Sequence, residues 1–140
     1  MIKLIVGEKG KGKTKVLLDA VNEAAKEAKG NIVFIDKDKS HMYELKNTIR
    51  LVCITDYSVR STDGFEGFIS GLIAADHDLE KIFIDGFLKI SSAANAETAV
   101  ELLKKLDELS DRFDVEVIIS VSLLKDELPD DLKQRVIEAL

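Results

Sequence analysis

Hydrophobic residues gather along the chain in five short runs, separated by longer stretches with a helical repeat. Most of the runs are continuous and rich in β-branched residues, and do not alternate with polar residues. Continuous apolar runs are typical of parallel strands that are covered on both faces of a sheet. The predicted strands are Ile2–Val6, Ile32–Ile35, Leu51–Ile54, Ile82–Ile84 and Val115–Val121.

The stretches between the runs carry apolar residues at the three- and four-residue spacing of an amphipathic helix. A first helix is expected from Lys13 to Lys29, with Gly30 ending it. A second follows the apolar positions from Phe65 to Ile73. A third follows those from Ala96 to Leu106, and Asn95 is a suitable N-cap for it.

Two more helical segments complete the pattern. A short helix is expected within Lys39–Lys46, and a last helix has Pro129 in its first turn and carries Leu132, Val136 and Leu140. Alternating strands and helices predict an α/β fold: a three-layer, doubly wound, mostly parallel five-stranded sheet with right-handed crossovers. Ligands of such sheets bind at the carboxyl ends of the strands.

Composition sets limits on the class of protein. A chain of 140 residues suits a single domain, and 46% hydrophobic with 33% charged residues is ordinary for a globular protein. The net charge of −6 gives no broad basic surface for nucleic acid or anionic membrane. Cys53, the only cysteine, lies in an apolar run and is expected to be a reduced core residue. Without a membrane-spanning stretch or a signal peptide, we expect a cytoplasmic protein.

The segment Gly7–Thr14, which reads Gly-Glu-Lys-Gly-Lys-Gly-Lys-Thr, matches the phosphate-binding P-loop pattern G-x-x-x-x-G-K-S/T at every fixed position. A predicted strand precedes it and a predicted helix follows. Its glycines allow successive backbone N–H groups to turn inward around phosphate oxygens. The N-terminus of the following helix adds its dipole to the same anion. The motif therefore predicts that the chain binds ATP or another nucleoside triphosphate with Mg²⁺.

Within the motif, Lys13 is expected to reach the β- and γ-phosphates and Thr14 to place its hydroxyl on Mg²⁺. Lys9 and Lys11 are not part of the fixed pattern; they either add positive potential at the mouth of the site or are solvated surface lysines. The predicted nucleotide-binding residues are Gly7, Glu8, Lys9, Gly10, Lys11, Gly12, Lys13, Thr14 and Lys15.

Three predicted strands lead into aspartate. Asp36 follows the second strand directly, with Asp38 two residues further on, Asp56 follows the third strand after Thr55, and Asp85 follows the fourth. In a parallel sheet these strand ends share an edge with the P-loop segment. Carboxylates there hold Mg²⁺ or orient an attacking water.

Asp85 is the strongest of these candidates. An apolar strand that ends in aspartate is the Walker B pattern, whose carboxylate secures the magnesium shell. Thr14 and Asp85 are therefore the predicted metal ligands. Many ATPases place a glutamate directly after this aspartate to activate water, but this chain has Gly86 there. The catalytic carboxylate is either absent or lies elsewhere.

Two motifs give the chain a likeness to a known family. Phe34-Ile35-Asp36-Lys37-Asp38 resembles the second-strand motif Phe-Ile-Asp-x-Glu of RecA-like ATPases, and Ile84-Asp85-Gly86 resembles their Walker B aspartate followed by a small residue. The order of elements over Met1–Ile90 is also similar, and the strand at Val115–Val121 matches more loosely. The resemblance implies a P-loop NTPase fold.

The resemblance also implies that Lys13, Asp38 and Asp85 are catalytic, with Asp38 as the water-activating carboxylate. The family has glutamate at this position, so Asp38 is one methylene shorter; alternatively it is a solvated residue of the charged run Asp36–Lys39. RecA-like sites often lie between subunits, which implies a homo-oligomer. Arg60 then points toward a neighbour's nucleotide or is a surface arginine.

The resemblance gives several other residues two interpretations. Ser120 or Ser122 senses the γ-phosphate or bonds its own backbone. Tyr43 packs on adenine or covers the core. His41 and His77 have neither metal-ligand spacing nor a nucleophile partner, and receive no role.

Three functions remain open on this basis. The first is an ATP·Mg²⁺-binding protein that hydrolyses ATP slowly and acts as a molecular switch or motor-like module. The second is a small-molecule kinase with Asp36 at its acceptor site, although no arginine-rich lid is recognisable. The third is a non-catalytic module that senses ATP or binds a protein partner, which Gly86 and the aspartate at position 38 favour.

Overall fold

The chain forms an α/β structure on a six-stranded, all-parallel sheet in the computed structural model, which describes all 140 residues. The strands are β1 (Ile2–Val6), β2 (Asn31–Asp36), β3 (Ile49–Cys53), β4 (Leu79–Ile84), β5 (Glu116–Val121) and β6 (Val136–Ala139). Their order in the sheet is β3-β2-β4-β5-β1-β6. The predicted parallel sheet is confirmed, whereas the predicted count of five strands is wrong.

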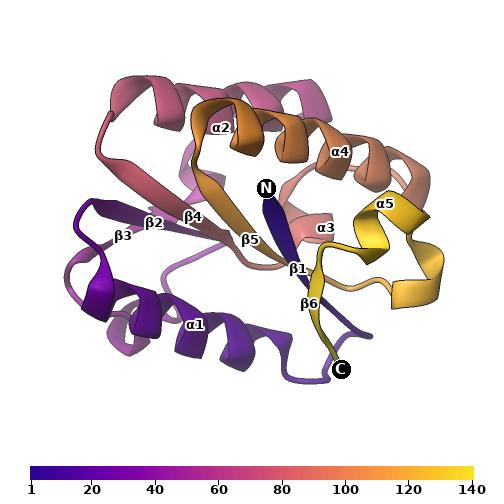
Figure 1. The fold of residues 1–140 in the computed structure, drawn as a ribbon, viewed down its shortest axis with the longest axis horizontal. Coiled ribbons are helices and arrows are strands. Elements are labelled where there is room, and N and C mark those ends of the chain that lie inside the picture. Colours follow the sequence, from indigo (N-terminus) through magenta and orange to yellow (C-terminus); the bar gives the residue numbers. More distant parts are fainter.

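Helices cover both faces of this sheet (Figure 1). One face carries α1 (Lys13–Glu27), and the other carries α2 (Thr62–Ala75) and α4 (Ala96–Phe113). Two further helices are short: α3 (Phe87–Ile90) follows β4, and α5 (Asp130–Lys133) precedes β6. No helix is long and apolar enough to cross a bilayer.

Burial on both faces explains the continuous apolar runs. In β2, Val33 and Ile35 belong to the hydrophobic cluster on the α2 and α4 side, while Ile32 and Phe34 belong to the cluster beneath α1. Successive side chains of a strand point to opposite faces, so a strand covered on both sides needs apolar residues at every position. Cys53 is buried and unpaired, as predicted.

Local signals set some of the helix ends. Asn95 caps α4 as predicted, because its side-chain oxygen accepts the N–H of Thr98 at 2.9 Å. The prediction that Gly30 ends the first helix is wrong: α1 ends at Glu27, and Ala28 already has extended backbone angles. The helix expected within Lys39–Lys46 is reduced to one 3₁₀ turn, η1 (Met42–Glu44).

The largest correction concerns the C-terminus. The predicted last helix ends after one turn, and the chain then enters β6, which pairs parallel to β1. Leu4 donates its backbone N–H to the carbonyl of Arg135 at 2.8 Å, and Leu140 donates to the carbonyl of Val6 at 2.9 Å. Without β6, β1 would be an edge strand with unpaired backbone groups. Pairing with that edge outweighs the weak helical pattern of this segment.

Candidate functional site

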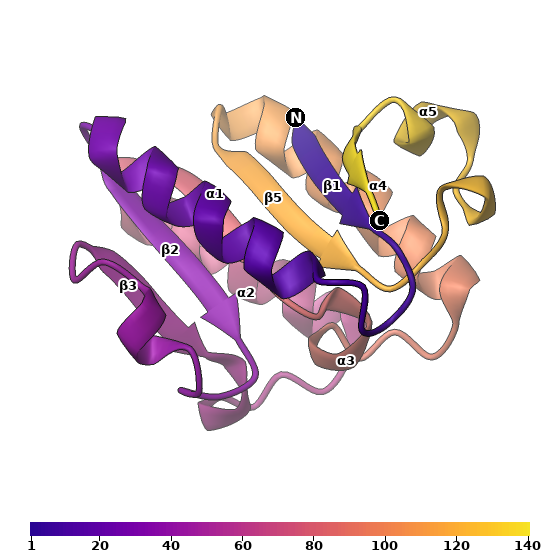
Figure 2. The same ribbon diagram turned by 90° about the horizontal axis from the view of Figure 1, so that it is seen from below.

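A cavity of about 610 Å³ lies at the carboxyl ends of β1, β2, β4 and β5. Figure 2 shows the β1–α1 loop and α3 at this same end of the sheet. The lining residues are Lys9, Gly10, Gly12, Lys13 and Thr14 after β1; Asp36 and Lys37 at the end of β2; Asp85, Gly86, Leu88, Lys89 and Ile90 after β4; and Ser120 and Ser122 at the end of β5.

The loop Gly7–Thr14 needs its glycines for two different reasons. Gly10 and Gly12 have φ angles of 85° and 96°, with open space where a Cβ would lie, so the backbone conformation itself favours glycine. At Gly7 the reason is also packing, because a Cβ would lie 2.6 Å from the carbonyl oxygen of Leu140. The N–H of Gly7 donates to the carbonyl of Leu123 at 3.0 Å and so does not face the cavity.

The last two residues of the loop are held by polar contacts. The ammonium group of Lys13 folds back over the loop and donates to the carbonyl of Glu8 at 2.8 Å. Burial lowers the pKa of Lys13, and the nearby charge of Asp85 partly offsets this. Thr14, in the first turn of α1, donates its hydroxyl to both carboxylate oxygens of Asp85, at 3.0 and 3.2 Å.

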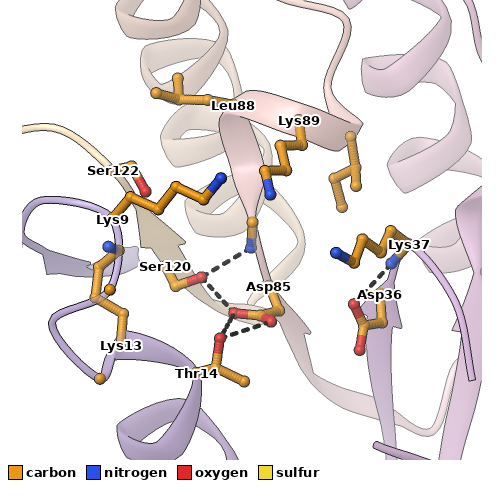
Figure 3. A pocket seen from close by; sticks show the side chains of 14 residues that line it. Lys9, Lys13, Thr14, Asp36, Lys37, Asp85, Leu88, Lys89, Ser120 and Ser122 are labelled. Atoms are coloured by element: carbon orange, nitrogen blue, oxygen red, sulfur yellow. Dashed lines mark hydrogen bonds between the residues drawn. The ribbon is translucent and has the colours of Figure 1, made fainter. Parts of the chain in front are cut away.

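Asp85 is the centre of a buried hydrogen-bond network (Figure 3). Besides the Thr14 hydroxyl, its carboxylate accepts the hydroxyl of Ser120 at 2.7 Å, and the N–H of Gly86 donates to the Ser120 oxygen at 2.9 Å. The alternative that Ser120 bonds its own backbone is therefore wrong. Asp85 is only 8% exposed, yet no lysine, arginine or histidine forms an ion pair with it. A buried carboxylate without a direct ion-pair partner is a favourable place for a cation.

A second buried carboxylate, Asp36, lies across the cavity from the loop. It accepts the backbone N–H of Lys37 at 2.7 Å, and its other oxygen lies 2.9 Å from Nδ1 of His41. This hydrogen bond holds the pKa of His41 above its usual value. Potential ligand atoms of Asp36, His41 and Asp85 lie within 4.8 Å of one another.

His41 is a site-forming residue that the sequence pattern did not single out. It follows Asp36 by five residues, in a segment that is neither strand nor regular helix. Only the fold of the β2–η1 connection brings its ring back onto the strand end. A histidine shortly after an acidic strand end is the sole sequence signal, and it is a weak one.

Other predicted residues lie away from the cavity. Asp38 is exposed, and its carboxylate accepts the N–H of Ser40 at 2.9 Å in a local turn. Hydrogen bonding by Ser40, first through its side chain and then through its backbone N–H, lowers the pKa of Asp38. Asp56 is exposed in the 3₁₀ turn after β3. Tyr43 is 92% exposed, so it does not cover the core.

The loop lysines divide into two groups. Lys9 and Lys13 line the cavity, whereas Lys11 and Lys15 do not. Lys15 instead pairs with Asp19 at 3.1 Å on the exposed side of α1. The backbone carbonyl of Glu8 accepts the hydrogen bond from the ammonium group of Lys13. Lys89, from α3, is a further lining residue that no sequence motif indicated.

A scan against models of known protein families found no match to this chain. A search among curated proteins found no match either. The inference of function therefore depends on the geometry of the cavity and on the motifs that line it.

Proposed function

We propose that the chain binds a nucleoside triphosphate, ATP being the first candidate, together with Mg²⁺ in this cavity, and hydrolyses it slowly. In this proposal it is a minimal P-loop NTPase of the RecA-like type. The observation that carries the proposal is the 3.0 Å contact between Thr14 and Asp85. These residues are 71 positions apart, and two independent motifs predict that they share one metal ion.

The loop supports the phosphate part of the proposal. The first turn of α1 has no acidic residue, and its free N–H groups together with the helix dipole favour an anion at Gly12. Lys13 lines the cavity next to Gly12. On binding, its ammonium group would exchange the carbonyl of Glu8 for phosphate oxygens, a stronger, charge-assisted hydrogen bond.

The donor set supports the metal part. Thr14 and Asp85 offer a hydroxyl and a carboxylate, the oxygen ligands that Mg²⁺ prefers. Bound there, Mg²⁺ would neutralise charge on the phosphates. Ser120 holds the Asp85 carboxylate in place through its 2.7 Å hydrogen bond.

For hydrolysis we assign Asp36, and not Asp38, as the carboxylate that positions the attacking water. Asp36 is 2% exposed and lines the cavity, whereas Asp38 is exposed and engaged by Ser40. The Lys37 N–H and His41 hold the Asp36 side chain still. Because Asp36 stands at the aspartate of the Phe-Ile-Asp-x-Glu motif, and not at its glutamate, a slow rate is expected.

Calorimetry with ATP and Mg²⁺ tests the binding proposal. Lys13→Ala removes a charge-assisted hydrogen bond, and should weaken binding by about 10- to 100-fold. Lys11→Ala is the matched control, because it removes the same charge from the same loop at a residue outside the cavity. Unchanged affinity in Lys13→Ala would overturn the proposal.

A phosphoryl-transfer function has one observation in its favour. Asp36 faces the cavity beside Lys37, where it could accept a hydrogen bond from the hydroxyl of an acceptor. Phosphorus-31 NMR with candidate acceptors separates the two reactions: a phosphorylated product indicates a kinase, and free phosphate indicates hydrolysis. Nucleotide binding without either product would indicate a sensing module.

A further inference from the structure

Three lysines line the cavity in addition to Lys13 of the P-loop motif. Lys9 comes from the β1–α1 loop, Lys37 follows β2, and Lys89 lies in α3. Figure 3 shows the ammonium ends of Lys9 and Lys89 beside each other, with that of Lys37 directed toward the same space. Lys9 and Lys89 lie across Asp85 and Ser120 from Thr14, and Lys37 lies beside Asp36. The three are called here the lysine clamp.

No member of the lysine clamp has an acidic partner. None of the three takes part in any ion pair of the molecule. The chain has 26 acidic and 20 basic residues, so acidic partners are abundant elsewhere. Lys9 first, and then Lys37, lower the pKa of Lys89, because like charges disfavour its protonated form. In the absence of a ligand the three charges repel one another.

The charge of the whole cavity points to a polyanion. Its lining carries four lysines against two aspartates. One of these, Asp36, already has His41 as a partner. A neutral ligand would leave the lysine repulsion in place, whereas the terminal phosphate of a nucleotide held by the Gly7–Thr14 loop would relieve it.

We propose that the lysine clamp holds the terminal phosphate of the bound nucleotide, so that the chain prefers triphosphates to diphosphates and completes its own catalytic site. The inference rests on the proposed function and deepens it. Lys13 and Lys9 would hold the phosphates from the loop side, and Lys37 and Lys89 from the β2 and α3 side. Cationic groups in such a position stabilise the negative charge of the transferring phosphoryl group.

The reaction balances without proton exchange at the clamp. The water oxygen forms a bond to the terminal phosphorus, and the bond from that phosphorus to the bridging oxygen breaks. The electron pair of the broken bond stays on the diphosphate, while the water proton passes to Asp36 and then to solvent. The lysines remain protonated and act only through charge and hydrogen bonds. No arginine lines the cavity to supply this charge instead.

The test compares the affinities of the 140-residue chain for Mg²⁺·ATP and Mg²⁺·ADP by calorimetry. The clamp variant is Lys37→Met with Lys89→Met, which keeps an unbranched side chain one atom shorter and removes two exposed charges. The matched control is Lys39→Met with Lys46→Met, which removes equal charge at exposed residues outside the cavity. The clamp variant should lose about 10-fold or more in ATP affinity and keep its ADP affinity, because a hydrogen bond between charged groups contributes this much. The control should lose neither.

Phosphate release gives a second readout. The clamp variant should turn over ATP at least about 100-fold more slowly, the effect of removing a preorganised charge at the reacting group. Lys37→Arg with Lys89→Arg should restore the preference for ATP, because the charges return.

Results that would reject the lysine clamp differ from those that would reject nucleotide binding. An unchanged ATP-to-ADP affinity ratio in the clamp variant, or an equal loss in the control, overturns the clamp while leaving the proposed function intact. A Lys13→Ala variant that binds both nucleotides as well as the parent overturns the proposed function itself. Equal losses of ATP and ADP in the clamp variant would assign the lysines to a general electrostatic field and reject the terminal-phosphate contact.

Discussion

In the proposed function, two aspartates of the cavity have different roles because their surroundings differ. Asp85 is held by the hydroxyls of Thr14 and Ser120 and has no ion-pair partner. Asp36 is also buried but lies against the ring of His41. The first arrangement leaves the negative charge of Asp85 available to bind a cation. The second keeps a carboxylate paired and oriented, as a group that positions water must be.

The Asp36–His41 pair predicts a pH dependence of stability. Asp36, the largest influence, and the charges of Glu44 and Asp85 raise the pKa of folded His41. The folded state therefore binds the proton more tightly than the unfolded state. The stabilisation is complete below the unfolded pKa of about 6.5 and is lost as pH rises through the higher folded pKa.

For the nucleotide-free protein, the free energy of unfolding should fall by about 1 kcal/mol across this window, the size of one hydrogen bond. His41→Gln should abolish that part of the pH dependence in urea unfolding curves. His77→Gln, at an exposed residue, is the control and should retain it. If the free energy of unfolding depended on pH equally in His41→Gln and wild type, the Asp36–His41 pair would not be the source of that dependence.

At the scale of elements, the glycines of α2 and Gly7 of the β1–α1 loop differ in whether they leave space for a larger side chain. Gly67 and Gly71 lie on the exposed side of α2, with open space where a Cβ would project from either residue. Gly7 lies where the loop passes β6, at φ 148° and against Leu140. A methyl group is sterically free at the first two positions and obstructed at the third.

Gly67→Ala and Gly71→Ala should each stabilise the protein by about 0.5–1 kcal/mol, because alanine loses less backbone entropy in a helix. The measurement is the free energy of unfolding in urea, with an unchanged slope on denaturant. Destabilisation by either change would mean that α2 packs against something at these positions.

Gly7→Ala should destabilise the protein by about 1–3 kcal/mol, because its Cβ would meet the Leu140 carbonyl at 2.6 Å and its φ is unfavourable. The same unfolding assay measures the loss. Truncation of Leu140 removes the obstructing carbonyl, so Gly7→Ala should cost less in the shortened chain. An equal cost in both backgrounds would assign the whole effect to backbone strain.

At the scale of the whole molecule, every residue that the proposed mechanism uses comes from one chain. Arg60, the candidate for reaching a neighbour's nucleotide, does not line the cavity. We therefore expect turnover per chain to be independent of protein concentration. In mixtures with Lys13→Ala, activity should fall in proportion to the fraction of wild-type chain. A steeper fall would show that neighbouring chains complete the site, as the resemblance to RecA-like ATPases implies.

Pattern and propensity were sufficient for the positions of five strands, three long helices and the Gly7–Thr14 loop. These features depend on residues close together in the sequence: burial on both faces dictates continuous apolar strands, and Asn95 caps the helix that it precedes. The C-terminal segment was the largest exception. Its apolar residues fit a weak helix, but the open edge of β1 outweighed that preference.

The sequence by itself determined which residues carry phosphate and metal chemistry in the proposed function, because Gly7–Thr14 and the aspartate after β4 are local patterns with a local physical cause. Only the tertiary structure decided which of the two carboxylates at the end of β2 faces the cavity. It placed Asp36 there and Asp38 in a solvent-exposed turn. It also brought His41 and Lys89 to the site, since parallel strand order joins loops that are far apart along the chain. Such convergence depends on packing between distant segments, which no local pattern encodes.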